Sequence, residues 1–136
     1  MRLLVFGASG TPGRELVHQA LERGHAVDAF VRRAAAMTTQ PGLNVVQGDV
    51  ADFSLVSAAM SRQDAVVSVL GVAEPLKHDP AVIAGIENIV RAMEATGLRR
   101  LLYLSFVGVR ESRAAVCFVL RYLHSNLGTH SDPIAC

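Results

Sequence analysis

Short apolar runs alternate along this chain with segments whose apolar residues recur at helical spacing. The runs are apolar at almost every position rather than at every second one, which is typical of strands buried on both faces. They predict five strands, at residues 3–6, 26–31, 43–46, 65–70 and 101–104. The helical spacing predicts helices over residues 13–23, 52–60 and 80–95. This order predicts an α/β fold, a Rossmann-like doubly wound parallel sheet with the strand order 3-2-1-4-5.

The length and composition of the chain fit one domain. Its 136 residues are 51% hydrophobic, which allows a sizeable core. We expect a single domain over residues 1–136, with its core at 1–115 and an atypical C-terminal segment at 116–136. The formal net charge of +1 gives no general attraction to nucleic acid or to a membrane surface.

The cysteines and the apolar runs predict a cytoplasmic location. Cys117 and Cys136 are too few for a disulfide framework and favour a reducing compartment. Glycine interrupts the first apolar run too early for a signal peptide, and no stretch approaches the roughly 18 apolar residues of a membrane span. The histidines have no metal-ligand spacing, so we expect no metal site. We therefore expect a soluble protein without a nucleic-acid or membrane partner.

A glycine-rich turn, GASGTPG, joins the first predicted strand to the first predicted helix. Gly7 would permit a sharp turn after the strand. Gly10 would let the backbone approach a pyrophosphate, and Gly13 would let the helix pack closely on the sheet. The start of the helix would then offer unpaired N–H groups to phosphate oxygens.

Three other residues of the turn fit the same interpretation. Ser9 and Thr11 could add hydroxyl donors, and Pro12 lacks an N–H but suits an opening helical turn. The alternative is a glycine-rich connection that binds nothing. The strand–turn–helix context in the first unit of an α/β chain favours a nucleotide. The chain has no Gly-Lys-Ser/Thr sequence, which argues against a P-loop triphosphatase.

The exit of the second predicted strand indicates which nucleotide would bind. A carboxylate there would bond the 2′-OH of NAD, whereas an arginine accommodates the 2′-phosphate of NADP. Asp28 lies mid-strand, too early to reach the ribose, and Arg32 and Arg33 follow the strand. A guanidinium can bind a phosphate bidentately. Solvated surface charge is the alternative, but the glycine turn favours a preference for NADP(H) over NAD(H).

Two later strand exits offer further candidate contacts. Asp49 could accept from an adenine amino group while Val50 lies against the ring. Capping of the next helix is an equal alternative for Asp49, although Asp52 could fill that role instead. Leu70 and Gly71 end the fourth predicted strand, where a small residue would let the middle of a cofactor pass.

Five motifs in this order resemble those of the atypical short-chain dehydrogenase/reductases, over roughly residues 1–115. They are GASGTPG at 7–13, VR at 31–32, GDV at 48–50, SVLG at 68–71 and YLSFVGV at 103–109. The most similar branch is the NAD(P)H-binding group that includes NmrA-like regulators and the flavin reductase/biliverdin-IXβ reductase type. The resemblance implies a Rossmann fold that forms one NAD(P)-binding domain and holds NADP(H).

The resemblance also implies a role for each matching residue. The pyrophosphate would be held by the residues of the glycine turn, which are Gly7, Ser9, Gly10, Thr11 and Gly13, with Pro12 in the same turn. Arg32 would meet the 2′-phosphate, and Asp49 and Val50 would hold adenine. Leu70 and Gly71 would line the ribose–nicotinamide side. Ser105 stands where the family often carries a serine or threonine near the nicotinamide, and Phe106 follows it in the same site. Where the flavin reductase type sometimes has a second basic residue, this chain has Ala36, so Arg33 would have to substitute.

The acid–base pair of typical short-chain dehydrogenases cannot form in this sequence. That Tyr-x-x-x-Lys pair needs a lysine after a tyrosine, but the single lysine, Lys77, precedes both Tyr103 and Tyr122. Tyr103 falls in an apolar strand pattern, which predicts burial. Any reduction would rely on holding a hydride donor against an acceptor, with Ser105 at most a hydrogen-bonding catalytic residue.

The C-terminal end departs from the α/β pattern. The apolar stretch at 114–123 suits one helix, and residues 124–136 are polar without a strand signal. The strand at 101–104 would therefore be an apolar edge strand that this helix or a second copy would need to cover. We expect a chain shortened or altered relative to its relatives, for which a frame change near residue 117 would account. A homodimer covering this edge is one arrangement that follows. The segment at 74–79 fits a lid or an ordinary surface loop equally.

Two classes of function fit these features. The first is an NADPH-dependent oxidoreductase that transfers a hydride to a flavin-, quinone- or carbonyl-type acceptor. The alternative is a non-catalytic NADP(H)-sensing or regulatory module, or a truncated inactive relative. The intact cofactor motifs fit both classes, and the absent Tyr-x-x-x-Lys pair favours the second.

Overall fold

The computed structural model describes residues 1–71 and 80–104. Residues Met1–Leu104 form one compact unit. The predictions for the segment at 74–79, for Ser105 and Phe106, and for everything after them lie outside the described residues.

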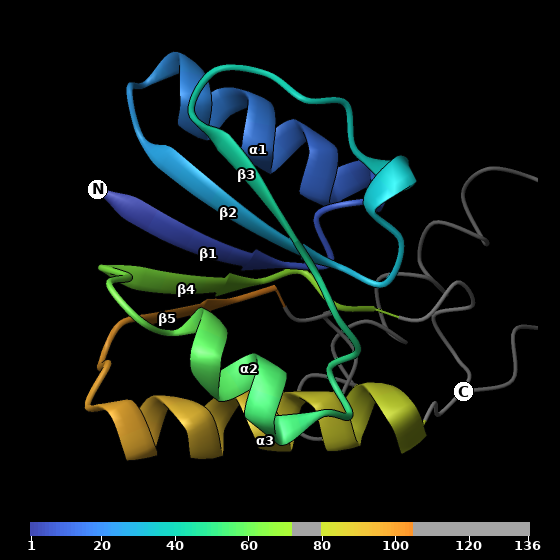
Figure 1. Cartoon of the computed structure of the whole chain (residues 1–136), viewed down its shortest axis with the longest axis vertical. Coiled ribbons are helices and arrows are strands. Elements are labelled where there is room, and N and C mark those ends of the chain that lie inside the picture. Colours follow the sequence, from blue (N-terminus) through green and yellow to red (C-terminus); the bar gives the residue numbers. More distant parts are fainter. Residues whose placement is uncertain (72–79, 105–136) are drawn as a thin grey trace, which may run out of the picture. The chain divides into compact units, whose positions relative to one another are not determined.

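Five parallel strands form one sheet in the order β3-β2-β1-β4-β5, which confirms the predicted Rossmann-like topology. The strands are β1 (Arg2–Phe6), β2 (Ala26–Val31), β3 (Leu43–Gln47), β4 (Ala65–Ser68) and β5 (Leu101–Tyr103). In the register of the sheet, Phe6 lies between Phe30 and Ser68. Because the strands are parallel, their carboxyl ends lie together at one edge of the sheet, as Figure 1 shows.

Helices cover both faces of this sheet. Figure 1 shows α1 (Thr11–Glu22) on one side and α2 (Phe53–Ala59) with α3 (Pro80–Thr96) on the other. A short 3-10 turn, η1 (Ala34–Ala36), follows β2 and was not predicted. Leu4 and Phe6 point into the core beneath α2 and α3, whereas Val5 points into the core beneath α1, and all three are 0% exposed. The central strand is therefore buried on both faces, as its sequence predicts.

Two element boundaries differ from the prediction by two residues, and the others agree to within one residue. Helix α1 begins at Thr11 because Gly10 is its N-cap and Pro12 fits in its first turn. Strand β4 ends at Ser68, two residues before the predicted end, although the Val69 N–H still donates to the Phe6 carbonyl at 3.0 Å. The chain then leaves the sheet beside the glycine turn.

Strand β5 lies at the end of the described sheet, and within residues 1–71 and 80–104 it pairs only with β4. It also corrects one expectation. The prediction that Tyr103 is buried is wrong, because its side chain is 47% exposed and that of Leu102 is 53% exposed. An apolar sequence buries a strand only where other elements cover it. That a second copy covers this edge stays a prediction.

Two features are absent from the described residues: a helix that could span a membrane and a cluster of metal-ligating side chains. No helix within 1–71 and 80–104 combines the length and apolar character needed to cross a bilayer. The same residues contain no group of three or more histidine, cysteine or acidic side chains placed to hold a metal ion.

Candidate functional site

In the turn after β1, the fold itself requires glycine at two positions, Gly7 and Gly13. Gly7 has a φ of +81°, and a β-carbon there would lie 2.8 Å from the carbonyl carbon of Val69. A β-carbon on Gly13 would overlap the Gly7 carbonyl oxygen and lie 2.7 Å from the Ala8 Cα. Close packing of the turn against α1 and the end of β4 therefore excludes a side chain at both positions.

Gly10 has no such internal reason to be glycine. Its φ of −74° and ψ of 167° suit any residue, and a β-carbon would meet nothing nearer than the Gly7 carbonyl oxygen at 3.5 Å. Gly10 is exposed and borders a pocket at the carboxyl ends of the strands. Because Gly10 has no side chain, its backbone is accessible from the pocket, and a ligand could approach it closely.

The pocket at the carboxyl ends of the strands has a volume of about 300 Å³. Eight of the predicted site residues line it: Gly7, Ser9, Gly10, Arg32, Asp49, Val50, Leu70 and Gly71. The structure therefore brings together candidates from four separate strand exits. Six lining residues were not predicted as site residues: Phe30, Val31, Gly48, Val69, Ala81 and Val82.

The other predicted residues lie behind the pocket or outside the description. Thr11, Pro12 and Gly13 form the first turn of α1, and Arg33 is the N-cap residue of η1. Ser105 and Phe106 fall outside the described residues, so their predicted roles stay predictions.

The start of α1 gives this edge of the sheet a positive character. The first helical turn has no acidic residue, and Gly10 provides no side-chain cap. The N–H groups of a first turn lack helical partners and carry the positive end of the helix dipole. An anion beside Gly10 would therefore find donors already oriented toward it.

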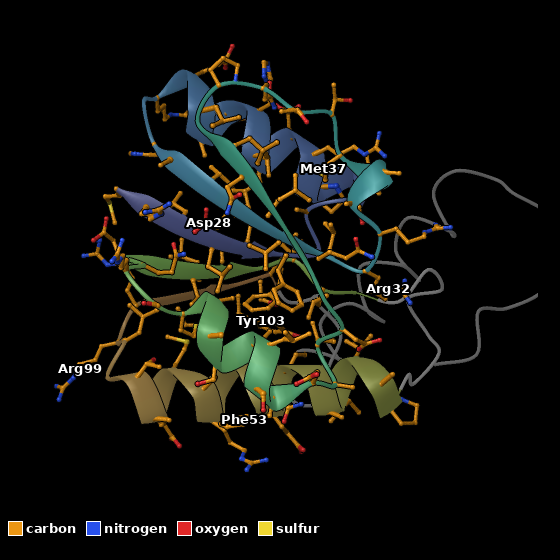
Figure 2. All side chains as sticks on the ribbon, in the orientation of Figure 1. Asp28, Arg32, Met37, Phe53, Arg99 and Tyr103 are labelled. Carbon is orange, nitrogen blue, oxygen red and sulfur yellow. The ribbon has the colours of Figure 1, made fainter. Side chains whose placement is uncertain are left out.

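Arg32 is placed to add a full positive charge. It is exposed at the exit of β2 and lines the pocket. Figure 2 shows it at the end of the sheet opposite Arg99. Within the described part of the chain, the Arg32 side chain makes no ion pair, whereas Arg2 pairs with Asp28 at 3.3 Å.

The segment after β3 is held from α3, which sequence analysis missed. The Asn88 amide donates to the Val50 carbonyl at 2.9 Å and to the Ala51 carbonyl at 3.1 Å. A β-carbon on Gly85 would lie 2.6 Å from the Val50 Cγ2, so this glycine lets α3 pack against the segment. Glycine and asparagine are poor helix formers, and their spacing by three on one helix face was the signal available.

Asp49 proves not to be a helix cap. Asp52 is the N-cap of α2, and its carboxylate accepts from the N–H groups of Ser54 and Leu55. Asp49 instead accepts from the Ala51 N–H at 2.9 Å, an Asx turn that fixes the carboxylate at the rim of the pocket. This contact removes the capping alternative for Asp49 and leaves its predicted role toward adenine as a hypothesis.

Asp28 lies away from the pocket, as its mid-strand position predicts. It is 7% exposed, accepts from Asn44 at 3.1 Å and from the Gln63 amide, and pairs with Arg2. Figure 2 shows it along β2, well before the strand exit at Arg32. These partners satisfy a buried carboxylate and give Asp28 a structural role.

A doubly wound sheet with a glycine turn and a positive helix start at its pocket defines a dinucleotide-binding domain. A family model described as NAD(P)H-binding matches residues 7–127. The chain belongs to this NAD(P)H-binding family, within the atypical short-chain dehydrogenase/reductase group.

Curated relatives and solved structures agree with this assignment. The photosystem II assembly factor Ycf39 of Synechocystis is 32% identical over 115 residues, covering 82% of this chain and 35% of the relative. A 3 beta-hydroxysteroid dehydrogenase/isomerase of Mycobacterium tuberculosis is 34% identical over 115 residues, covering 76% of this chain and 31% of the relative. The chain thus spans about a third of the length of these relatives.

Two solved structures are similar to the described fold. Uronate dehydrogenase from Agrobacterium tumefaciens, in a complex with NAD, is 27% identical with a TM-score of 0.66, over 76% of this chain and 40% of that chain. The Escherichia coli anaerobillin reductase ChuY has a TM-score of 0.71 over 93% of this chain and 61% of that chain, and its 24% identity supports the fold alone. These structures share the fold of this chain, and the uronate dehydrogenase structure contains NAD.

Proposed function

We propose that this domain binds NADP(H) in the pocket at the strand exits and presents it for hydride transfer to a flavin-, quinone- or carbonyl-type acceptor. The observation that carries the proposal is Gly10, a glycine that the fold does not need, at the mouth of a pocket with a positive rim. When bound, the cofactor would supply the hydride. The chain's own residues would bind and orient it.

Each part of the pocket has a task in this proposal. The N–H groups at the start of α1 receive the pyrophosphate beside Gly10. Arg32 binds the 2′-phosphate, and Asp49 with Val50 holds the adenine at the segment that Asn88 fixes. Leu70 and Gly71 line the path toward the nicotinamide.

A preference for NADPH is tested by Arg32→Ala. The loss of one charge-assisted phosphate contact should raise the NADPH dissociation constant by about tenfold or more, while that for NADH changes little. Fluorescence titration of both nucleotides measures this. Arg99→Ala is the matched control, because Arg99 is exposed at the other end of the sheet. An unchanged NADPH/NADH preference in Arg32→Ala would disprove the assignment.

A second candidate function is a binding module without turnover. This alternative is favoured because Lys77, the single lysine, precedes both Tyr103 and Tyr122, so this sequence has no Tyr-x-x-x-Lys pair. The relatives include, by name, a dehydrogenase/isomerase and an assembly factor. NADPH oxidation measured with flavin and quinone acceptors separates the two. Tight NADPH binding without oxidation of NADPH by any acceptor would favour the module.

A further inference from the structure

We propose that Arg14 is a positioning residue, which holds the backbone on one side of Arg32 so that the Arg32 guanidinium meets a 2′-phosphate. The inference rests on the proposed function. Arg14 lies in the N-terminal part of α1 and bridges two segments that are distant in sequence. Its Nε donates to the Ser9 carbonyl at 3.0 Å, and its Nη2 donates to the Ala36 carbonyl at 3.2 Å.

The Ala36 contact reaches Arg32 through a short hydrogen-bonded turn. The Ala36 N–H donates to the Arg33 carbonyl at 3.0 Å, so the bond from Arg14 anchors the turn η1 that begins beside Arg32. On the other side of Arg32, the Val31 carbonyl accepts from the Gly48 N–H at 3.0 Å. Arg32 is therefore held between two fixed points, of which Arg14 provides one.

The Ser9 contact connects the same side chain to the glycine turn. Ser9 and Arg32 both line the pocket, one on the proposed pyrophosphate side and one at the proposed 2′-phosphate. A guanidinium is planar and presents its donors in a rigid fork, so one side chain can set the spacing between two carbonyls. Arg14 thereby fixes the distance between the two anion-binding parts of the pocket.

A purely structural role is the competing explanation. Arg14 also borders a small cavity with Val17, Met37 and Thr38, so its loss could simply loosen the packing of α1. A loosened domain would bind NADPH and NADH more weakly by the same factor. A positioning role toward Arg32 would instead lower the preference between them, which makes the ratio of the two dissociation constants the deciding measurement.

The experiment compares Arg14→Ala, Arg14→Lys, Arg32→Ala and the double variant Arg14→Ala/Arg32→Ala in the full chain. Titration of intrinsic nicotinamide fluorescence gives both dissociation constants, and thermal unfolding reports stability. Arg23→Ala is the matched control, because Arg23 follows the same helix and its side chain bonds only to Gln19 among the described residues. The ratio of the NADPH and NADH dissociation constants of Arg23→Ala should equal that of the wild type.

We expect Arg14→Ala to reduce the NADPH/NADH preference about fivefold to tenfold, and the double variant to show no further loss beyond Arg32→Ala, as coupled residues do. Arg14→Lys keeps the positive charge but lacks the planar guanidinium that reaches both carbonyls. It should therefore lose most of the preference for NADPH over NADH. Retention of the full preference by Arg14→Lys, or additive losses in the double variant, would overturn the positioning role.

The two proposals fail in different ways. Wild type that binds neither nucleotide overturns both the proposed function and this inference. Wild type that prefers NADPH, with the preference lost in Arg32→Ala but kept in Arg14→Ala, overturns only the role of Arg14. Equal affinity of wild type for NADPH and NADH overturns the roles of Arg32 and Arg14 while leaving nucleotide binding in place.

Discussion

At the scale of single residues, the glycine turn separates what the fold needs from what a ligand needs. Backbone atoms of Val69 and Leu70 leave no room for a side chain on Gly7, and those of Gly7 and Ala8 leave none on Gly13. At Gly10, the nearest atoms lie at ordinary van der Waals distance from an added β-carbon. Replacement of the three glycines should therefore affect stability and cofactor binding differently.

We expect Gly10→Ala to lose less than about 1 kcal/mol of stability, the scale of an altered N-cap, and to bind NADPH at least tenfold more weakly. Gly13→Ala should lose several kcal/mol, because the turn and α1 must move apart to admit the methyl group. Denaturant unfolding and NADPH titration of both variants test this. Equal cofactor affinity in Gly10→Ala and wild type would contradict the role given to Gly10.

At the scale of elements, α3 does more than cover the sheet. Asn88 reaches 38 residues back along the chain to the Val50 carbonyl, and Gly85 gives Val50 its space. The segment that carries Asp49 is therefore placed by a helix from the next βαβ unit. The sequence predicted both the helix and the segment, but only the spacing of Gly85 and Asn88 on one helix face hinted that they meet.

We expect Asn88→Ala to lose about 1 kcal/mol of stability, since two backbone carbonyls lose a donor, one of them in a part-buried hydrogen bond. NADPH affinity should fall as well, because the segment with Asp49 and Val50 is no longer fixed. Chemical unfolding and cofactor titration measure the two effects. Glu87→Ala, an exposed change on the same helix, is the control and should alter neither. If Asn88→Ala lowered stability but left NADPH affinity unchanged, the proposed role of α3 in positioning the pocket residues would be wrong.

At the scale of the whole molecule, the pocket gathers residues from the exits of β1, β2, β3 and β4. A ligand that spans these exits would contact all four segments at once in the folded state. Binding to the folded state alone stabilises a protein by about 2.7 kcal/mol when the ligand is present at a hundred times its dissociation constant. The cofactor should therefore raise the unfolding temperature of the full chain.

We expect 2′,5′-ADP, which carries the 2′-phosphate, to raise the melting temperature of the full chain by ~5 °C or more at saturation. At the same concentration, 5′-ADP should raise it less, because it has no 2′-phosphate for Arg32 to bind. Differential scanning calorimetry measures both shifts. A larger effect of 5′-ADP would show that the pocket does not select the 2′-phosphate.

The sequence by itself determined the order, type and topology of the elements. Apolar runs, helical spacing and glycine or proline at the element ends act over a few residues, so they can be read without a structure. Gly7, Arg32, Asp49 and Gly71 could be named as candidates because strand exits converge at one edge of any parallel sheet.

Only the tertiary structure decided which long-range contacts hold those candidates in place. The contacts of Arg14 with Ala36 and of Asn88 with Val50 join segments 22 and 38 residues apart, and they depend on how each helix is seated on the sheet. The exposure of Tyr103 was decided in the same way, by what lies beside β5 rather than by its apolar sequence. Local patterns fix which elements form, but hydrogen bonds and burial between elements exist only once the register and packing of the whole sheet are set.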